Sequence, residues 1–298
     1  MNPTIPHIPI GDVVDAGIGW LRANAGAFFD GLSALLAILT DALTDLLLAV
    51  PEPVAIVLFA LLGWLLRSWK MALATLVTFL LIWSMNQWTT SMQTLALVLI
   101  ATVIAVVLAI PLGIWAARND AVSAALKPIL DFMQTMPAFV YLIPAILFFG
   151  IGAAPGLIAT LIFALPPGVR MTELGIRGVD HETVEAGHAF GASDGQILRG
   201  IQLPLAVPTI MAGVNQVIML ALSMAVIAGM VGADGLGKEV VSAISTLNTA
   251  KGVEAGLSVV FLAIYLDRLT GSLARPGDQR TSLLAWLRSR RQAAARAS

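Results

Sequence analysis

The sequence predicts an all-α, polytopic membrane protein with about seven transmembrane helices and an amphipathic N-terminal helix in the membrane interface. Its 298 residues are 58% hydrophobic and 12% charged, with a mean hydropathy of +0.89. That is far more apolar than a soluble domain of this length. Charge-free runs cover residues 71–117, 132–169 and 200–233. Each run exceeds the roughly 20 residues that a spanning helix needs, so the runs predict membrane spans.

The N-terminal region, residues 1–50, is expected to stay outside the membrane core. Residues 1–16 are rich in proline and acidic side chains and are expected to be irregular. Residues 17–49 predict a helix with polar side chains on one face and leucines on the other, typical of an interfacial helix. A full span is the competing interpretation, which places Asp41 and Asp45 at a costly depth. The chain opens without a positive segment before an apolar core, so no cleavable signal peptide is expected.

Seven spans are expected after the break at Pro51 and Pro53. They are residues 53–69, 71–88, 91–117, 129–149, 155–174, 205–231 and 253–270. Interior prolines break helical hydrogen bonding and are tolerated in a membrane where protein or a water-filled path surrounds them. They are Pro111, Pro137, Pro144, Pro166, Pro167 and Pro208. Packing kinks explain any one of them, but their clustering in spans three to six favours a moving or pore-lining core.

The basic residues predict the orientation in the membrane. With the N-terminus outside, 14 of the 17 basic residues fall on the inner side, and only Arg22, Lys238 and Lys251 fall outside, as the positive-inside rule requires. The C-terminus is then inside. The expected organisation is an N-terminal region, two spans over 51–90, a core over 91–271 with a cytoplasmic loop at 175–204, and an Arg-rich cytoplasmic tail at 272–298.

The cytoplasmic loop predicts two short helices separated by a glycine turn. Asp180 can cap the first helix and Gly191 can end it, while Ser193 and Gln196 have capping-box spacing for the second, which leads into Leu203-Pro204. A helix of about ten residues is unstable alone in water, so the segment needs a supporting surface. An ordinary intracellular loop is the alternative on physical grounds alone.

The same loop resembles the EAA loop of ABC importer permeases, whose pattern is EAA, three residues, G, nine residues, I-x-L-P. It reads Glu185-Ala186-Gly187, then Gly191, then Ile201-Gln202-Leu203-Pro204. Gly187 replaces the second alanine, a change that lowers helix propensity but keeps the surface small. The resemblance implies the type I ABC importer permease fold and a coupling helix that docks on an ATPase. The coupling residues would be Glu185, Ala186, Gly187, Phe190, Gly191, Ala192, Ile201, Leu203 and Pro204.

A wider resemblance, over about residues 90–270, is to the permeases of glycine betaine and proline betaine importers. It implies a subunit that carries quaternary ammonium osmoprotectants across the inner membrane. The expected partners are a second copy of the chain, two ATP-binding cassette subunits, an extracytoplasmic substrate-binding protein and the lipid bilayer. ATP and Mg would be bound by the ATPase, so this chain would be no enzyme and would carry no cofactor.

The remaining motifs are weaker. The chain contains no Walker A pattern, which argues against nucleotide hydrolysis. It contains no cysteine, which excludes thiolate chemistry. Its net charge of −1 argues against a nucleic-acid partner. Residues 232–238, GADGLGK, are interpreted as an outer loop near the binding protein. Asp131 is expected to cap a helix rather than guide a cation. Polar side chains deep in the spans are candidates for lining a pore, although helix contacts use such side chains as often. These are Gln134, Thr135, Tyr141, Asn215, Gln216 and Ser223.

Two other classes of function remain open at this point. An ion-gradient-driven secondary transporter or channel predicts ionisable residues buried in mid-span, and the charge-free runs count against it. A membrane scaffold without transport fits the composition but leaves the proline-broken spans and the cytoplasmic loop unexplained.

Overall fold

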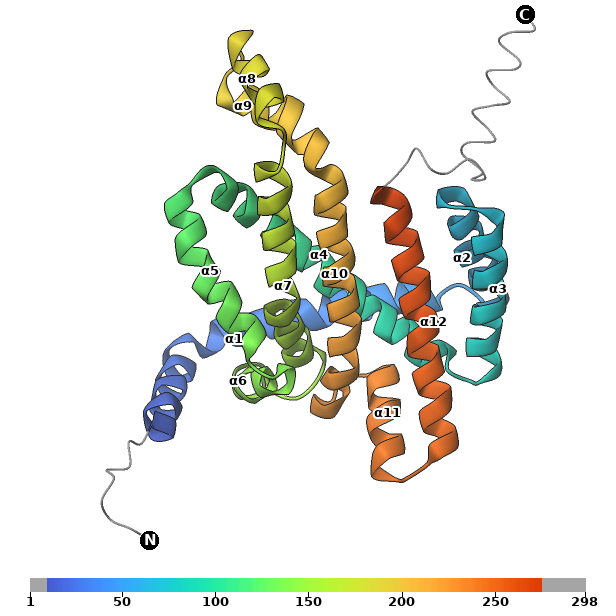
Figure 1. Cartoon of the computed structure of the whole chain (residues 1–298). Helices are drawn as coiled ribbons and strands as arrows, with labels where there is room; N and C mark the ends of the chain where they lie inside the picture. The colour runs from blue at the N-terminus through green and yellow to red at the C-terminus, as the bar shows by residue number, and fades with distance from the viewer. Residues whose placement is uncertain (1–9, 275–298) are drawn as a thin grey trace, which may run out of the picture.

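The computed structural model describes residues 10–274, and every regular element in that range is a helix (Figure 1). The α-helices are α1 (Ile10–Leu48), α2 (Glu52–Leu66), α3 (Trp69–Ser84), α4 (Trp88–Arg118), α5 (Asp120–Thr135), α6 (Leu142–Phe149), α7 (Ala153–Arg177), α8 (His181–Ala189), α9 (Asp194–Ile197), α10 (Leu203–Ala228), α11 (Leu236–Ser245) and α12 (Thr249–Ala274). Three further short helical segments are η1 (Ala138–Tyr141), η2 (Leu198–Gln202) and η3 (Gly229–Val231).

The prediction of an all-helical membrane protein is confirmed. Within the described residues, five stretches are long and apolar enough to cross a membrane, namely those of α1, α4, α7, α10 and α12, and a bent helix pair makes a possible sixth. The apolar helices α2 and α3 have 15 and 16 residues. At 1.5 Å per residue they extend only about 22–24 Å, less than the roughly 30 Å of a hydrocarbon core.

The predicted span at 129–149 is not one continuous helix. Helix α5 ends at Thr135 and the chain turns by 103° into the segment that leads to α6. Met136 has an extended ψ of 137°, as residues before proline do, and Pro137 has no N–H to continue the ladder. One proline therefore converts an apolar run into two helices.

The N-terminal helix is longer than expected. It begins at Ile10 and is bent at Ala25, so the prediction of irregular structure is wrong for residues 10–16. Residues 1–9 and most of the Arg-rich tail, 275–298, lie outside the described residues. Helix α1 runs across the long helices in Figure 1. It is fastened by Phe29, which stacks on Phe148 with ring centroids 4.5 Å apart, and by Ser33, whose hydroxyl donates to the Phe149 carbonyl.

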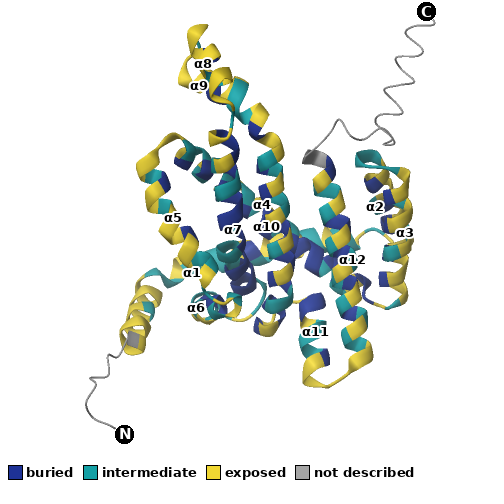
Figure 2. Ribbon diagram, viewed as in Figure 1, coloured by how far each residue is buried: buried dark blue, intermediate teal, exposed yellow. Residues whose placement is uncertain are grey.

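Helix α7 lies at the centre of the bundle, and Figure 2 shows it buried over most of its length. Close contact with its neighbours depends on small residues. In lipid the hydrophobic effect does not drive helices together, so they associate by close packing, which small side chains allow. A Cβ added at Gly113 of α4 would lie 2.5 Å from Cβ of Thr172 in α7. Helix α10 packs on the other side of α7, where Gly213 meets Met171 equally closely.

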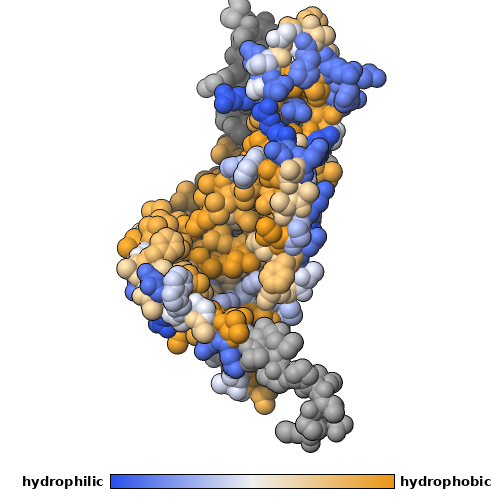
Figure 3. Space-filling model, turned by 90° about the vertical axis from the view of Figure 1, so that its left-hand side faces the viewer, coloured by the Kyte–Doolittle hydropathy of each residue, from blue (hydrophilic) through white to orange (hydrophobic). Residues whose placement is uncertain are grey.

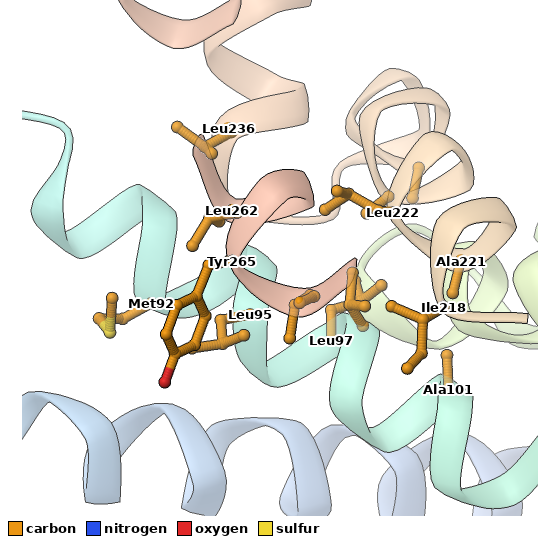
Figure 4. Close-up of a cluster of buried hydrophobic side chains, with 14 of the residues drawn as sticks. Met92, Leu95, Leu97, Ala101, Ile218, Ala221, Leu222, Leu236, Leu262 and Tyr265 are labelled. Carbon is orange, nitrogen blue, oxygen red and sulfur yellow. The ribbon is translucent and has the colours of Figure 1, made fainter. Parts of the chain in front are cut away.

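The main hydrophobic core joins α4, α10, α11 and α12 and also takes in buried residues of α1, α2, α3 and α7. Leu95 and Leu97 of α4 meet Leu222 of α10 and Leu262 of α12 there (Figure 4). Helix α11 contributes Leu236, which is fully buried. The interpretation of residues 232–238 as a loop is therefore wrong from Leu236 onward, because the amphipathic segment after Gly235 closes the core.

Candidate functional site

The loop predicted at 175–204, called the coupling loop below, projects from one end of the molecule. Helices α8 and α9 lie beyond the ends of all the long helices except α10, into which the loop continues (Figure 1). Polar side chains gather at this end, above a largely apolar and hollowed face (Figure 3). The loop is therefore the part of the described chain that extends furthest from the apolar bundle on this side.

The two ends of α8 form as the sequence predicts. The Asp180 carboxylate accepts from the Thr183 N–H at 3.0 Å, which satisfies an orphan donor of the first turn. At the other end Gly191 has a φ of +79°. Its N–H donates to the His188 carbonyl, and that of Ala192 donates to the Gly187 carbonyl. This pair of hydrogen bonds is a Schellman motif.

The second half of the loop is continuous with α10. Ser193 and Gln196 form the predicted capping box at the start of α9. The Leu203 N–H donates to the Leu198 carbonyl, five residues back, which makes η2 a π-helical turn. Pro204 follows and has no N–H to donate to the helix. The π-helical turn therefore lies directly before a position where the i to i−4 hydrogen bond is missing. Residues 194–231 form one continuous helical stretch of 38 residues.

Gly187 faces the inside of the loop. It is buried, and a Cβ added there would lie 2.8 Å from Cδ1 of Ile201 and 3.3 Å from Cγ1 of Ile197. The expectation that its small size serves a partner surface is therefore wrong, because the residues that approach it belong to the same loop. The glycine lets α8 lie directly on the helix that enters α10.

The opposite side of the loop is open. Phe190 is 92% exposed, and Glu185 points outward next to His181, with 3.3 Å between Oε1 and Nδ1. Of the nine predicted coupling residues, some are exposed and the others face inward or sit partly buried. The exposed ones are Glu185, Ala186, Phe190, Gly191 and Pro204. The loop thus exposes one large apolar side chain on a small, polar surface. On its inner side, Gly187 packs against Ile201.

An ion-pair network, which the sequence analysis missed, holds the base of the loop. Arg177 at the end of α7 pairs with Asp120 at 2.7 Å and with Glu173 at 3.1 Å, and it donates to the Ala116 carbonyl at 2.7 Å. The Ser123 hydroxyl donates to the same Glu173 carboxylate. Charged residues at the ends of apolar runs were the available signal, but their pairing depends on the α4–α5 turn meeting α7.

A cavity of about 420 Å³ opens between α5, α7 and α10. Three of the six predicted pore residues line it: Gln134, Asn215 and Gln216. Arg170 also lines it. Its guanidinium pairs with the Asp131 carboxylate at 2.5 Å and donates to Oε1 of Gln134 at 3.1 Å. Asp131 lies inside α5 and caps no helix, so the capping prediction is wrong.

The other three predicted pore residues do not line this cavity. The Tyr141 hydroxyl is turned into the bundle and donates to the Met133 carbonyl at 2.9 Å. Thr135 and Ser223 donate to carbonyls of their own helices, those of Phe132 and Met219. Their side chains make the local bonds that hydroxyls commonly form in apolar helices.

Comparison with known proteins identifies the family. Residues 109–276 match the family model described as binding-protein-dependent transport system inner membrane component. The chain belongs to this family. Its members are multi-pass transport permeases, which agrees with the apolar spans and with the resemblance found in the sequence.

Several relatives match nearly the whole chain. The glycine betaine transport system permease protein OpuAB of Bacillus subtilis is 49% identical over 90% of this chain and 95% of that protein. The glycine betaine/carnitine transport permease protein GbuB of Listeria monocytogenes is 47% identical over 90% and 96%. The glycine betaine/proline betaine permease ProW of Escherichia coli is 46% identical over 92% of this chain and 77% of its own length.

A solved structure supports the fold. The MetNI methionine ABC transporter, in an inward-facing conformation, contains a chain that aligns with a TM-score of 0.57 at 21% identity. The alignment covers 61% of this chain and 92% of that chain. At this identity the likeness concerns the fold, and the type I permease architecture predicted from the resemblance is confirmed.

Proposed function

We propose that this chain is the membrane-spanning subunit of an ATP-driven importer for quaternary ammonium osmoprotectants of the glycine betaine and proline betaine class. The observation that carries the proposal is the identity of 46–49% over about nine tenths of the chain with relatives whose names all state glycine betaine transport. A separate extracytoplasmic binding protein would deliver the substrate, as the family description implies.

In this proposal the coupling loop transmits the closure of an ATPase dimer to the membrane helices. Phe190 would insert into a groove of the ATPase, with Glu185, Ala186, Gly191 and Ala192 around it. An exposed aromatic surrounded by small residues has the composition of an interface anchor. Ile201, Leu203 and Pro204 would then pass the displacement into α10. Two ATPase subunits would bind ATP and Mg, and a second copy of this chain would complete the pathway.

The proposed orientation places the coupling loop and the C-terminus in the cytoplasm and the N-terminus outside. The distribution of basic residues supports it. Helix α1 is proposed to lie in the outer interface, where the exposed Leu35, Ile38 and Leu46 would face lipid.

The test is uptake in proteoliposomes that contain the chain with its ATPase, supplied with binding protein. Glycine betaine uptake should require both internal ATP and the binding protein. Phe190→Asp should abolish uptake, because a carboxylate cannot enter an apolar groove without an unpaired buried charge. Val207→Asn, at an exposed position of α10 outside the loop, is the matched control and should retain uptake.

Uptake driven by a sodium or proton gradient without ATP would instead support the secondary-transporter alternative. Wild-type rates in the Phe190→Asp variant would remove the coupling role of the loop while leaving the transport proposal intact.

A further inference from the structure

Arg170 lines the cavity between α5, α7 and α10, and Asp131 lies next to the cavity lining as the ion-pair partner of Arg170. Arg170 follows the charge-free run 132–169 and Asp131 precedes it, and the bend after α5 brings the two together. The guanidinium has five N–H donors, of which the structure uses one on Asp131 and one on Gln134. Donors therefore remain free beside the cavity.

A purely structural role explains this pair poorly. The side chains of Arg170 and Asp131 are 40% and 64% exposed, and exposed ion pairs contribute little net stability. The pair lies at the ends of the charge-free run 132–169, and Arg170 faces the cavity, where a ligand could reach it. A weakly stabilising pair can also open at little cost when a ligand offers both charges better partners.

The cavity has the size and lining of a small-molecule site. Its volume of about 420 Å³ falls within the roughly 300–1,000 Å³ of typical ligand pockets. Gln134, Asn215 and Gln216 line it together with the apolar Met219 and Leu220. The Asn215 amide is bonded to Asp267 and Thr270 of α12, so Gln134 and Gln216 are the amides that can face a ligand. These groups suit a ligand with one hydrogen-bonding end and one end that has methyl groups.

We propose that Arg170 and Asp131 form a zwitterion-binding site within the permease, in which Arg170 receives the ligand carboxylate and Asp131 faces its quaternary ammonium group. This inference rests on the proposed function and concerns the substrate after it leaves the binding protein. The Arg170 fork matches carboxylate geometry. The ammonium has no N–H to donate, so its attraction comes from the Asp131 charge and from contact with the apolar wall.

The same arrangement discriminates against ligands with a single charge. A zwitterion exchanges the Arg170–Asp131 pair for two new pairs and leaves no charge without a partner. A cation such as choline occupies Asp131 but leaves Arg170 unpaired and close to a like charge, which is unfavourable in a partly desolvated site. The pair would therefore act as a second filter for zwitterions in the membrane subunit.

The test measures direct binding of radiolabelled glycine betaine and choline to the complex of the chain with its ATPase in lipid nanodiscs, without the binding protein. We expect saturable glycine betaine binding to the wild type and much weaker choline binding. Arg170→Gln combined with Asp131→Asn should weaken glycine betaine binding by about tenfold or more, the size of loss that one charged hydrogen bond gives. Arg170→Gln alone should reverse the preference toward choline.

The control removes a similar ion pair elsewhere. Lys238 and Asp234 also pair, at 2.7 Å, and lie outside this cavity. Lys238→Gln with Asp234→Asn should bind glycine betaine as the wild type does. Arg170→Lys keeps the charge but loses the planar fork, and should weaken binding without the reversal of preference. Assembly with the ATPase, measured by size-exclusion chromatography, verifies that each variant folds.

Two results would overturn the site: no saturable binding to the wild type, or wild-type binding in the assembled double neutral variant. Uptake by the complete importer separates this failure from a failure of the proposed function. ATP-dependent glycine betaine uptake without binding to the permease rejects only the zwitterion site. Absence of uptake together with absence of binding rejects the betaine assignment itself.

Discussion

Gly191 determines the geometry at the tip of the coupling loop. Its φ of +79° lies in the left-handed region, where a residue with a Cβ costs roughly 1–2 kcal/mol. The Schellman hydrogen bonds of Gly191 and Ala192 depend on that conformation. The position of Phe190 relative to the second half of the loop therefore depends on the one residue that follows it.

Gly191→Ala should accordingly reduce ATPase binding and uptake several-fold, because the turn must open to relieve the strain. The measurement is co-purification of the ATPase together with glycine betaine uptake. Gly195→Ala is the matched control, since Gly195 lies within α9 and a Cβ there meets nothing within 4 Å. A Gly191→Ala variant that couples as well as Gly195→Ala would contradict the role of the turn.

Gly187 allows a finer prediction. Gly187→Ala places a Cβ 2.8 Å from the terminal methyl of Ile201, which can rotate away, and it gains about 1 kcal/mol of helix propensity. We expect near wild-type uptake. Gly187→Leu cannot be accommodated and should separate α8 from the second half of the loop, with loss of uptake. Partial rescue of Gly187→Leu by Ile201→Ala, measured in the same assay, would locate the defect between these two side chains.

At the scale of elements, Arg177 joins the α4–α5 turn to the end of α7 by binding groups of both. The Glu173 side chain is only 13% exposed, so loss of Arg177 leaves a mostly buried carboxylate that still accepts from the Ser123 hydroxyl but has lost its cation. Arg177→Ala should lower the free energy of unfolding by about 3 kcal/mol, the lower end for breaking a buried pair.

Thermal unfolding of the detergent-solubilised protein measures this effect. Glu173→Gln in the same chain removes the unpaired charge and should recover part of the lost stability. Equal melting temperatures for Arg177→Ala and the wild type would show that the network has no role in joining the two elements.

The elements differ in how well the sequence predicts them. The caps at Asp180, Gly191 and Ser193 were predictable because each depends on residues within one or two helical turns. The bend after Thr135 was signalled by Pro137, but hydropathy alone does not distinguish one span from two half-helices. Helix α11 was missed because its first residues were interpreted as part of the glycine-rich loop 232–238, although Leu236–Ser245 is amphipathic.

The candidate site shows the same division. The positions of the coupling residues follow from a local motif, whereas the direction in which Gly187 faces depends on Ile201, 14 residues later. The Arg170–Asp131 pair joins residues 39 apart across two elements. No local spacing predicts such a contact, which is why Asp131 was interpreted as a cap and Arg170 was not included.

At the scale of the whole molecule, the chain without cysteine permits a direct test of orientation. Helices α8 and α11 lie at opposite ends of the bundle (Figure 1). Phe190 and Ile244 are 92% and 69% exposed there. In intact cells that express the chain without its ATPase, a membrane-impermeant maleimide should label Ile244→Cys and leave Phe190→Cys unlabelled until the membrane is permeabilised. The reverse pattern would invert the proposed topology.

The unbroken backbone from α9 through η2 and α10 to η3 has a mechanical consequence. Thirty-eight helical residues amount to a rod about 57 Å long at 1.5 Å per residue. A rod of this length transmits a tilt by leverage, so a displacement applied at its α9 end would become a displacement of opposite sense at its η3 end, with the contact against α7 as the pivot. Communication between the two faces of the membrane then needs no relay of side-chain rearrangements, only a pivot that stays tightly packed.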